Sequence, residues 1–457
     1  MINPTVYFGM QSKMAKLNVL RMALMPLLVL LISLPVVLLL LVLDSEPSLA
    51  PLPALSPSEL NELEDILLEN APEATSRASQ KSITLDAEEL HLLLRYSAQL
   101  YEPSRPWTAQ IALSDEQLHV DANIGLVDFP SRFFLKMEST LGPEQGRFKI
   151  QQLTLGKLSV PARLIGPFLN LVIENLVAAN PARTGLEELA KQVSNLQISP
   201  AALSFDIQWQ PELIAGLSNQ IQQLFVSDED RRRIAHYHTL ISNTIAAIPS
   251  DIRAVPLHTL LISLFTAVRE ESDVSGNPAA ENRAAFQALS VYLNRKDIAS
   301  TTGFKSVQGM ANPRPVEVRL QQREDLAQHV ASVAAISSSA GAGLAQLLST
   351  TKEAYDARYR TGFSFSDLTA NSVGVALAEF ATRNDASALE FQRRVITLSD
   401  DSEYMPAVGN NRDGITEEAF SDRYRDRSSV EFAQRLREIQ TMIAERPFFA
   451  NQQKVDD

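Results

Sequence analysis

The pattern of apolar positions begins with one long uninterrupted run, from Met22 to Leu43. These 22 residues carry no charge. As a helix they would extend roughly 33 Å, enough to cross the apolar core of a bilayer, which is about 30 Å thick. Three cations precede the run, and no basic residue follows it before Arg77. The positive-inside rule therefore makes residues 1–21 a cytoplasmic tail and residues 22–43 a transmembrane helix.

This pattern predicts a single-pass protein of a bacterial inner membrane, with a cytoplasmic N-terminus and the bulk of the chain in the periplasm. The membrane is then a partner, contacted through residues 22–43. A cleaved signal peptide is the alternative, because the small residues "SLA" at 48–50 suit a cleavage site. The run is long for a signal, however, and Pro51 would follow the cut, so we favour the anchor.

Helix-start signals follow the apolar run. Residues 44–57 contain four prolines and predict a stiff, extended linker. Ser56 and Glu59 have the spacing of a capping box, so a helix is expected to begin there. Asp86 and Glu89 repeat that spacing at the start of "LDAEELHLLLRYSAQL", which predicts a second helix.

The next pattern is an alternation of apolar and polar residues, which is typical of strands. Two alternating stretches, 107–113 and 118–126, flank the turn "SDEQ" and predict a hairpin. Further strands are expected near 132–138, 147–160 and 203–209, with a helix at 162–178. Together these elements predict an α+β domain over residues 58–225, built on an antiparallel sheet with one buried face.

One resemblance follows from these segments. The stretch "ITLDAEELHLLL", then two strands, then "IQQLTLGKLSVPARLIGPFLNLVI", resembles the YpmS-like membrane-anchored extracytoplasmic domains over residues 82–210. The resemblance implies one membrane helix and a small α+β domain with no established catalytic role. It also implies a helix lying along a curved sheet, which would suit an apolar ligand or a partner surface.

From about residue 227 the apolar residues recur at helical spacing. Three helices are expected in the region 226–300, an irregular connector at 301–322, a helical core at 323–382 and a helical extension at 383–457. In the extension, an apolar stripe predicts packing on the helical domain: Phe432, Leu436, Ile439 and Ile443. The fold class is therefore α+β: a single N-terminal transmembrane helix, an antiparallel-sheet α+β domain and an all-α helical domain.

The composition of the chain excludes several classes of function. The chain of 457 residues has no cysteine, which excludes disulfides, thiol catalysis and cysteine-based metal sites. Without the three cations before the apolar run, 38 basic residues face 54 acidic ones, a net charge of −16. This excess of acid argues against nucleic acid as a partner. The motifs HExxH and GxSxG, the P-loop and the dinucleotide fingerprint are all missing from the sequence.

The residues with candidate catalytic or binding roles lie in the expected helical core at 323–382. Asp325 and His329 are four residues apart, on one face of a helix. Small residues follow them, which allow helix backbones to approach closely. Lys352, Glu353 and Asp356 lie on a second expected helix, and Asp367, Asn371 and Gly374 lie at i, i+4 and i+7 on a third, which Ser364 or Ser366 can cap. Three polar faces could thus turn toward a common centre.

These positions also carry a second resemblance. The order "D-x-x-x-H", "KE-x-x-D" and "GFS-x-x-DL-x-A-x-x-x-G" over residues 323–382 resembles small YfiM-type periplasmic lipoproteins and, more distantly, VanZ-like membrane proteins. The resemblance implies a site but no reaction, because the activity of those families is itself poorly defined. The matching positions are Asp325, His329, Lys352, Glu353, Asp356, Asp367, Asn371 and Gly374.

Three interpretations of this core stay open: a structural polar network, a hydrolytic or metal-binding site, and a binding site for an envelope glycan or lipid fragment. For the whole protein, an envelope lipid, glycan or protein is a possible partner. The leading hypothesis is an anchored envelope protein that binds or scaffolds, and the alternative is an envelope-substrate hydrolase or metal-dependent enzyme. In an enzyme, His329 would be the general base or a ligand, and Glu353 and Asp367 would orient it or hold a metal. The catalytic candidates are His329, Glu353 and Asp367; the binding candidates are Asp325, Lys352, Asp356 and Asn371. No cofactor or metal is identified, and the run "GNNRDGITEE" at 409–418 fails the calcium-loop spacing and is expected to be a plain loop.

Overall fold

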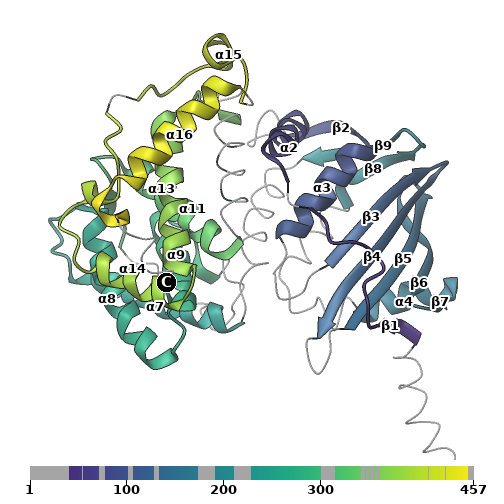
Figure 1. Ribbon diagram of the computed structural model, residues 1–457, viewed down its shortest axis with the longest axis horizontal. Coiled ribbons are helices and arrows are strands. Elements are labelled where there is room, and N and C mark those ends of the chain that lie inside the picture. The colour runs from purple at the N-terminus through teal and green to yellow at the C-terminus, as the bar shows by residue number, and fades with distance from the viewer. Residues whose placement is uncertain are drawn as a thin grey trace, which may run out of the picture. The chain divides into compact units, whose positions relative to one another are not determined.

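The computed structural model separates into two compact units (Figure 1). The first comprises Met1–Leu52, Pro103–Asn170 and Ile198–Ala201, and the second comprises the remainder. The expected α+β block at 58–225 is thus divided between both units. The described residues are 41–53, 55–71, 78–100, 107–127, 133–172, 191–209, 228–299, 314–340, 345, 349, 352, 355–356, 361–409, 411–427 and 429–450.

The first unit is built on an antiparallel sheet with the strand order β3-β4-β5-β6-β7, drawn as blue arrows in Figure 1. The predicted hairpin is confirmed: Trp107 lies opposite Ile124, and Ser114 lies opposite Gln117 across the turn. Ile165 of the following helix packs against the sheet residues Leu153 and Leu155. The elements are β3 (Trp107–Ser114), β4 (Gln117–Val127), β5 (Phe133–Glu144), β6 (Arg147–Leu155), β7 (Leu158–Val160) and α4 (Ala162–Val172).

The end of the long apolar run joins this sheet. Leu43 and Asp44 form strand β1 (Leu43–Asp44), which pairs with β5 where β6 has ended. The chain turns away from β6 at Gly156, whose φ of +56° suits glycine and whose missing side chain leaves room for the Leu41 carbonyl oxygen. That oxygen accepts a hydrogen bond of 2.8 Å from the backbone N–H of Lys157.

The prediction of a single-pass transmembrane protein is corrected by the structure. The expected helix at 22–43 is wrong at its last residue, because Leu43 pairs with β5 and does not continue a helix. Within the described ranges, no helix has the length and apolar character needed to cross a bilayer. Residues 22–40 of the expected span lie outside the described residues.

A smaller sheet has the strand order β2-β9-β8, and two helices precede and follow its first strand. Both predicted capping boxes are confirmed: Ser56 and Glu59 bond reciprocally, and so do Asp86 and Glu89. Strand β2 was not anticipated from the sequence. The elements are α2 (Pro57–Asn70), β2 (Ser79–Asp86), α3 (Ala87–Leu100), β8 (Val193–Ile198) and β9 (Ala202–Trp209).

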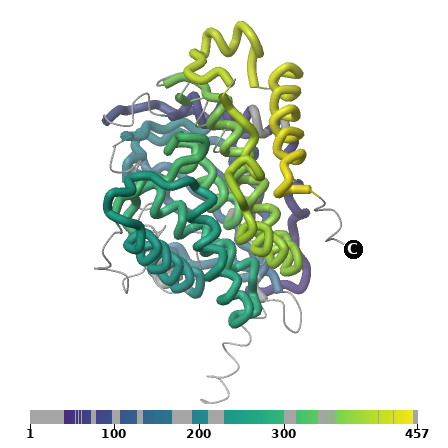
Figure 2. The backbone as a smooth tube through the Cα atoms, turned by 90° about the vertical axis from the view of Figure 1, so that its left-hand side faces the viewer, coloured from purple at the N-terminus to yellow at the C-terminus, as the bar shows by residue number. Residues whose placement is uncertain are grey.

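The helical part of the second unit is arranged around α9 (Pro278–Leu293). All but two of its 16 residues are buried, and it contacts α7, α8, α11, α13 and α14. Figure 2 shows these helices side by side, with the yellow tube of α16 at the edge. The other helices are α7 (Asp228–Ala247), α8 (Leu257–Ser275), α11 (Glu324–Ala340), α13 (Phe365–Thr382), α14 (Asp385–Val395), α15 (Glu417–Tyr424) and α16 (Val430–Ala444).

The helices predicted in the region 226–300 are confirmed as α7, α8 and α9. The connector at 301–322 is not irregular throughout. Its residues Glu317–Arg319 form strand β11, which pairs in parallel with β10 (Ala254–Pro256). The apolar stripe of the C-terminal extension packs on the helical core as expected, with Phe432, Ile439 and Ile443 buried and Leu436 partly buried.

Helices α11 and α13 approach closely at Gly374. A side chain there would place its Cβ 2.7 Å from the Val330 carbonyl oxygen and 3.0 Å from the Ala334 nitrogen. These neighbours are helix backbone and cannot swing aside. Glycine at position 374 is therefore a packing requirement, in keeping with the small residues that the sequence places on α11.

We expect Gly374→Ala to lower the free energy of unfolding by about 1–3 kcal/mol, the usual cost of overpacking a tight contact. Urea denaturation followed by circular dichroism measures the change. Gly409→Ala is the matched control, because no atom lies within 4 Å of the added Cβ. Equal effects of the two substitutions would contradict the role of Gly374.

Candidate functional site

The N-terminus of α13 is fixed by a double cap. The Ser364 hydroxyl accepts the backbone N–H of Asp367 at 3.0 Å, as predicted for one of the two candidate serines. The Ser364 hydroxyl in turn donates to Asp413 Oδ1 at 2.8 Å, and the same oxygen accepts the N–H of Ser366 at 3.0 Å. A carboxylate at a helix N-terminus is favoured by the helix dipole.

The loop that carries Asp413 is held to the start of α13 by backbone hydrogen bonds. The N–H of Phe363 donates to the Ile415 carbonyl at 2.7 Å, and the N–H of Ile415 donates back at 3.0 Å. Gly414 adopts a φ of +72° beside this bridge. The predicted plain loop at 409–418 therefore positions a charged residue of the site.

Arg323, which directly precedes α11, lies among three carboxylates. Its guanidinium is 2.6 Å from Asp325 Oδ2, 3.2 Å from Asp367 Oδ1 and 2.9 Å from Asp413 Oδ2. The hydrogen bond to Asp325 is the main reason that the pKa of Arg323 is raised, and the same bond lowers the pKa of Asp325. Burial raises the pKa of Asp413, but hydrogen bonds from Ser366, Ser364 and Arg323 outweigh it, so this pKa is also lowered.

His329 connects this charge cluster to Asn371. Its Nε2 lies 3.3 Å from Asp367 Oδ2, and its Nδ1 lies 2.9 Å from Asn371 Oδ1. A carbonyl oxygen only accepts, so Nδ1 donates the hydrogen bond. The side chains of His329 and Asp367 are 15% and 16% exposed, so the contact is largely shielded from water.

The sequence-predicted residues separate into two groups. Asp325, His329, Asp367 and Asn371 come together as expected. Lys352 and Asp356 bind each other, with 2.9 Å between Nζ and Oδ2. Glu353 lies outside the described residues.

Arg323 and Asp413 were missed as site residues. Arg323 could have been found from its position two residues before Asp325, but Asp413 is 46 residues beyond Asp367 in sequence and carries no such signal. In the described part of the chain, no three His, Asp or Glu side chains are arranged to hold a metal ion. The Arg323 guanidinium lies where a cation shared by the three aspartates would lie.

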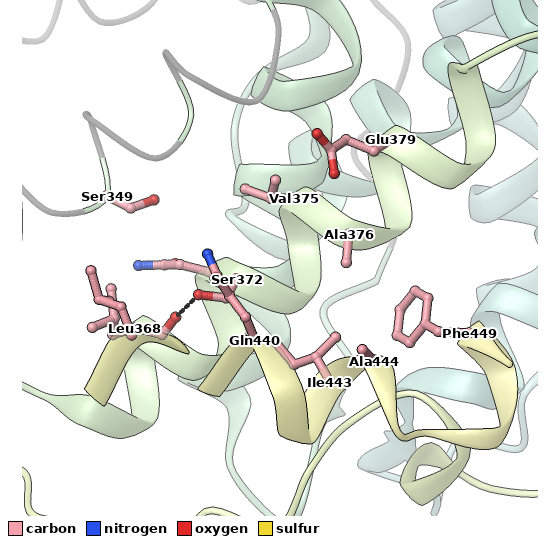
Figure 3. Close-up of a pocket in the computed structure, with 12 residues that line it drawn as sticks. Ser349, Leu368, Ser372, Val375, Ala376, Glu379, Gln440, Ile443, Ala444 and Phe449 are labelled. Atoms are coloured by element: carbon pink, nitrogen blue, oxygen red, sulfur yellow. Dashed lines mark hydrogen bonds between the residues drawn. The ribbon is translucent and has the colours of Figure 1, made fainter. Parts of the chain in front are cut away.

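A pocket of about 290 Å³ lies between α13 and α16, beside the charge cluster (Figure 3). Asn371 contributes to both, since it bonds His329 and also lines the pocket. Asn371 is only 2% exposed, and among the residues that the structure describes its buried Nδ2 has no hydrogen-bond partner. The lining residues are Ser349, Leu368, Asn371, Ser372, Val375, Ala376, Glu379, Leu436, Gln440, Ile443, Ala444 and Phe449.

We expect Asp413→Asn to weaken stability most at neutral pH. Because the pKa of Asp413 is lower folded than unfolded, its stabilising effect is complete above the unfolded value of about 3.9 and is lost as the pH falls through the folded value. The expected loss at pH 7 is about 1–3 kcal/mol, typical of a hydrogen bond to a charged group. Urea denaturation between pH 7 and 3 should show the variant and the parent chain converging at low pH.

Asp422→Asn is the control for this test, because Asp422 is exposed on α15 and no described residue pairs with it. It should leave stability unchanged across the pH range. A difference between Asp413→Asn and the parent chain that stays constant from pH 7 to 3 would contradict the charge interaction.

Comparison with protein-family models, with curated proteins and with solved structures found no match to this chain. The resemblances to YfiM-type, VanZ-like and YpmS-like proteins therefore stay predictions.

Proposed function

We propose that this chain is a binding protein, and that it binds a small ligand in the pocket between α13 and α16. The observation that carries the proposal is the pocket itself, in which apolar side chains of both helices enclose about 290 Å³ and a few polar side chains lie among them.

The charge cluster supports this role by holding Asn371 in place. His329 binds the amide oxygen, Asp367 contacts the other side of the imidazole, and Arg323 pairs with Asp367. This chain of contacts holds the Asn371 side chain, which lines the pocket, in one orientation. A recognition group supported in this way is pre-organised, which lowers the entropic cost of binding.

The pocket itself has the composition of a ligand site. Its volume of about 290 Å³ lies just below the usual range for small-molecule pockets, roughly 300–1,000 Å³. Apolar walls with a few placed polar groups are typical of such sites. The apolar lining residues are Leu368, Val375, Ala376, Leu436, Ile443, Ala444 and Phe449.

A hydrolase is the alternative, and one observation favours it: His329 and Asp367 lie in contact, as an imidazole and its orienting carboxylate would. However, both imidazole nitrogens already face protein groups, Asn371 on one side and Asp367 on the other. A general base must reach a proton of the substrate. The geometry therefore supports His329 as a positioning residue better than as a base.

The uncharged dye N-phenyl-1-naphthylamine tests the proposal on the full chain. We expect its fluorescence to rise on binding to the parent protein. In Ala444→Trp and Ala376→Trp the indole would fill the pocket and abolish the rise. Ala444 is exposed on α16, so its replacement should not impair folding.

Val274→Trp is the matched control, because Val274 lies on α8 with 84% of its surface exposed and does not line the pocket. Circular dichroism checks that each variant is folded. No fluorescence rise in the parent chain, or an equal rise in folded Ala444→Trp and Ala376→Trp, would overturn the proposal.

A further inference from the structure

His238 is buried on α7, the helix that packs against α9. Only 1% of its surface is exposed, and its Nδ1 has no hydrogen-bond partner among the described residues. Tyr237 beside it is fully buried, and Ile234 and Ile241, one turn to either side, belong to the same core. The packing of α7 therefore encloses a titratable ring without supplying a hydrogen bond to that nitrogen.

A cavity of about 230 Å³ lies beside this ring. His238 lines it together with residues from the last turn of α9, from the loop after α9, from the segment before β11 and from the start of α11. The Tyr292 hydroxyl fixes one wall, because it accepts the N–H of Val316 at 3.2 Å and donates to the Val316 carbonyl at 3.4 Å. With a cavity beside the ring, few contacts have to break before water reaches it.

The charges around the cavity oppose a proton on His238. Arg295 and Lys296 place two cations in the lining, and Glu324 places one carboxylate there. That carboxylate is already paired, with 2.9 Å between Arg295 Nη2 and Glu324 Oε1. Burial lowers the pKa of His238, because desolvation disfavours the charged ring, and the attraction of Asp297 offsets this only in part.

Three other described histidines differ from His238 in this respect. His236, His258 and His329 each have a carboxylate oxygen within 3.5 Å of a ring nitrogen. A proton on any of these rings would face a counter-ion. No described carboxylate lies in such a position beside His238. The fold therefore resists the protonation of His238 and provides no ion pair to offset its cost.

We infer that His238 is an acid-sensitive switch in the contact between α7 and the end of α9. When the ring takes up a proton, α7 separates from the turn at Arg295, and the ring reaches water through the cavity. Arg295 has a φ of +54° in this turn, a conformation that residues other than glycine rarely adopt, so the turn gains freedom when the contact opens. This switch is independent of the pocket between α13 and α16.

The direction of the pH dependence follows from the burial of the ring. Because the pKa of His238 is lower folded than its unfolded value of about 6.5, the closed contact binds fewer protons than the open one. The closed contact is therefore fully stable above this value and weakens as the pH falls below it. Between pH 7.5 and 5, the protection of α7 amides against hydrogen exchange, corrected for the intrinsic rate, should fall roughly tenfold.

Hydrogen exchange followed by mass spectrometry on the full chain tests this inference. Helix α14 is the internal reference because it contains no histidine, and its protection should not change. His238→Phe keeps a buried ring that cannot take up a proton, so the protection of α7 should no longer depend on pH. His238→Gln is a second uncharged variant that serves if phenylalanine disturbs the packing. His236→Gln is the matched control, because His236 lies on the same helix with its side chain 48% exposed, and it should keep the tenfold loss.

Four results would overturn the inference. An equal loss of α7 protection in the parent chain and in a folded His238→Phe or His238→Gln variant would show that another group titrates. Abolition of the loss by His236→Gln would assign the effect to His236. A loss of equal size in α14 would indicate unfolding of all the helices together, and unchanged α7 protection in the parent chain between pH 7.5 and 5 would show that no switch exists.

Discussion

The close approach of α11 and α13 at Gly374 is the constraint on which the site depends. The Val330 carbonyl lies where a side chain at position 374 would project, and His329 is the residue before Val330. Asn371 lies one turn before Gly374 on the facing helix. The 2.9 Å contact between His329 and Asn371 is therefore possible because the two backbones touch at the next turn. A bulkier residue at 374 would separate the recognition amide from its support.

The charge cluster stabilises the fold, and the pocket beside it is the proposed ligand site. Arg323 neutralises carboxylates contributed by α11, by α13 and by the loop at Asp413, so three segments meet through one guanidinium. A guanidinium can bind several carboxylates at once because its donors are fixed in one plane. Asn371 links this cluster to the pocket, because it bonds His329 and also lines the pocket. The paired charges thus hold one wall of the pocket in place.

Local sequence patterns predicted the elements well where a short-range rule applies. The capping boxes at Ser56 and Asp86, the hairpin after Trp107 and the cap at Ser364 each depend on residues within a few positions of one another. The i, i+4 spacing of Asp325 and His329 likewise placed both on one face of α11. Strands β2 and β11 were missed because their partners, β9 and β10, lie far away in the sequence.

The difference between short-range and long-range contacts also explains the residues missed at the site and the wrong assignment near the N-terminus. Asp413 reaches α13 through the backbone bridge between Phe363 and Ile415, a contact that no spacing rule encodes. The end of the apolar run was assigned to a membrane helix because hydropathy indicates that residues avoid water. It does not tell whether lipid or a protein sheet surrounds them. At Leu43 the neighbour is Leu135 of β5, so the same apolar character serves a sheet.

The position of Asn371 favours recognition over chemistry as the use of this cluster. A catalytic histidine needs one nitrogen directed at a substrate, whereas His329 has Asp367 on one side and Asn371 on the other. The group that the cluster holds at the wall of the pocket is the Asn371 amide, which neither accepts nor releases a proton in ordinary conditions. An amide can only orient a hydrogen bond. Contacts with a histidine, which in turn contacts an aspartate paired with an arginine, fix the orientation of this amide.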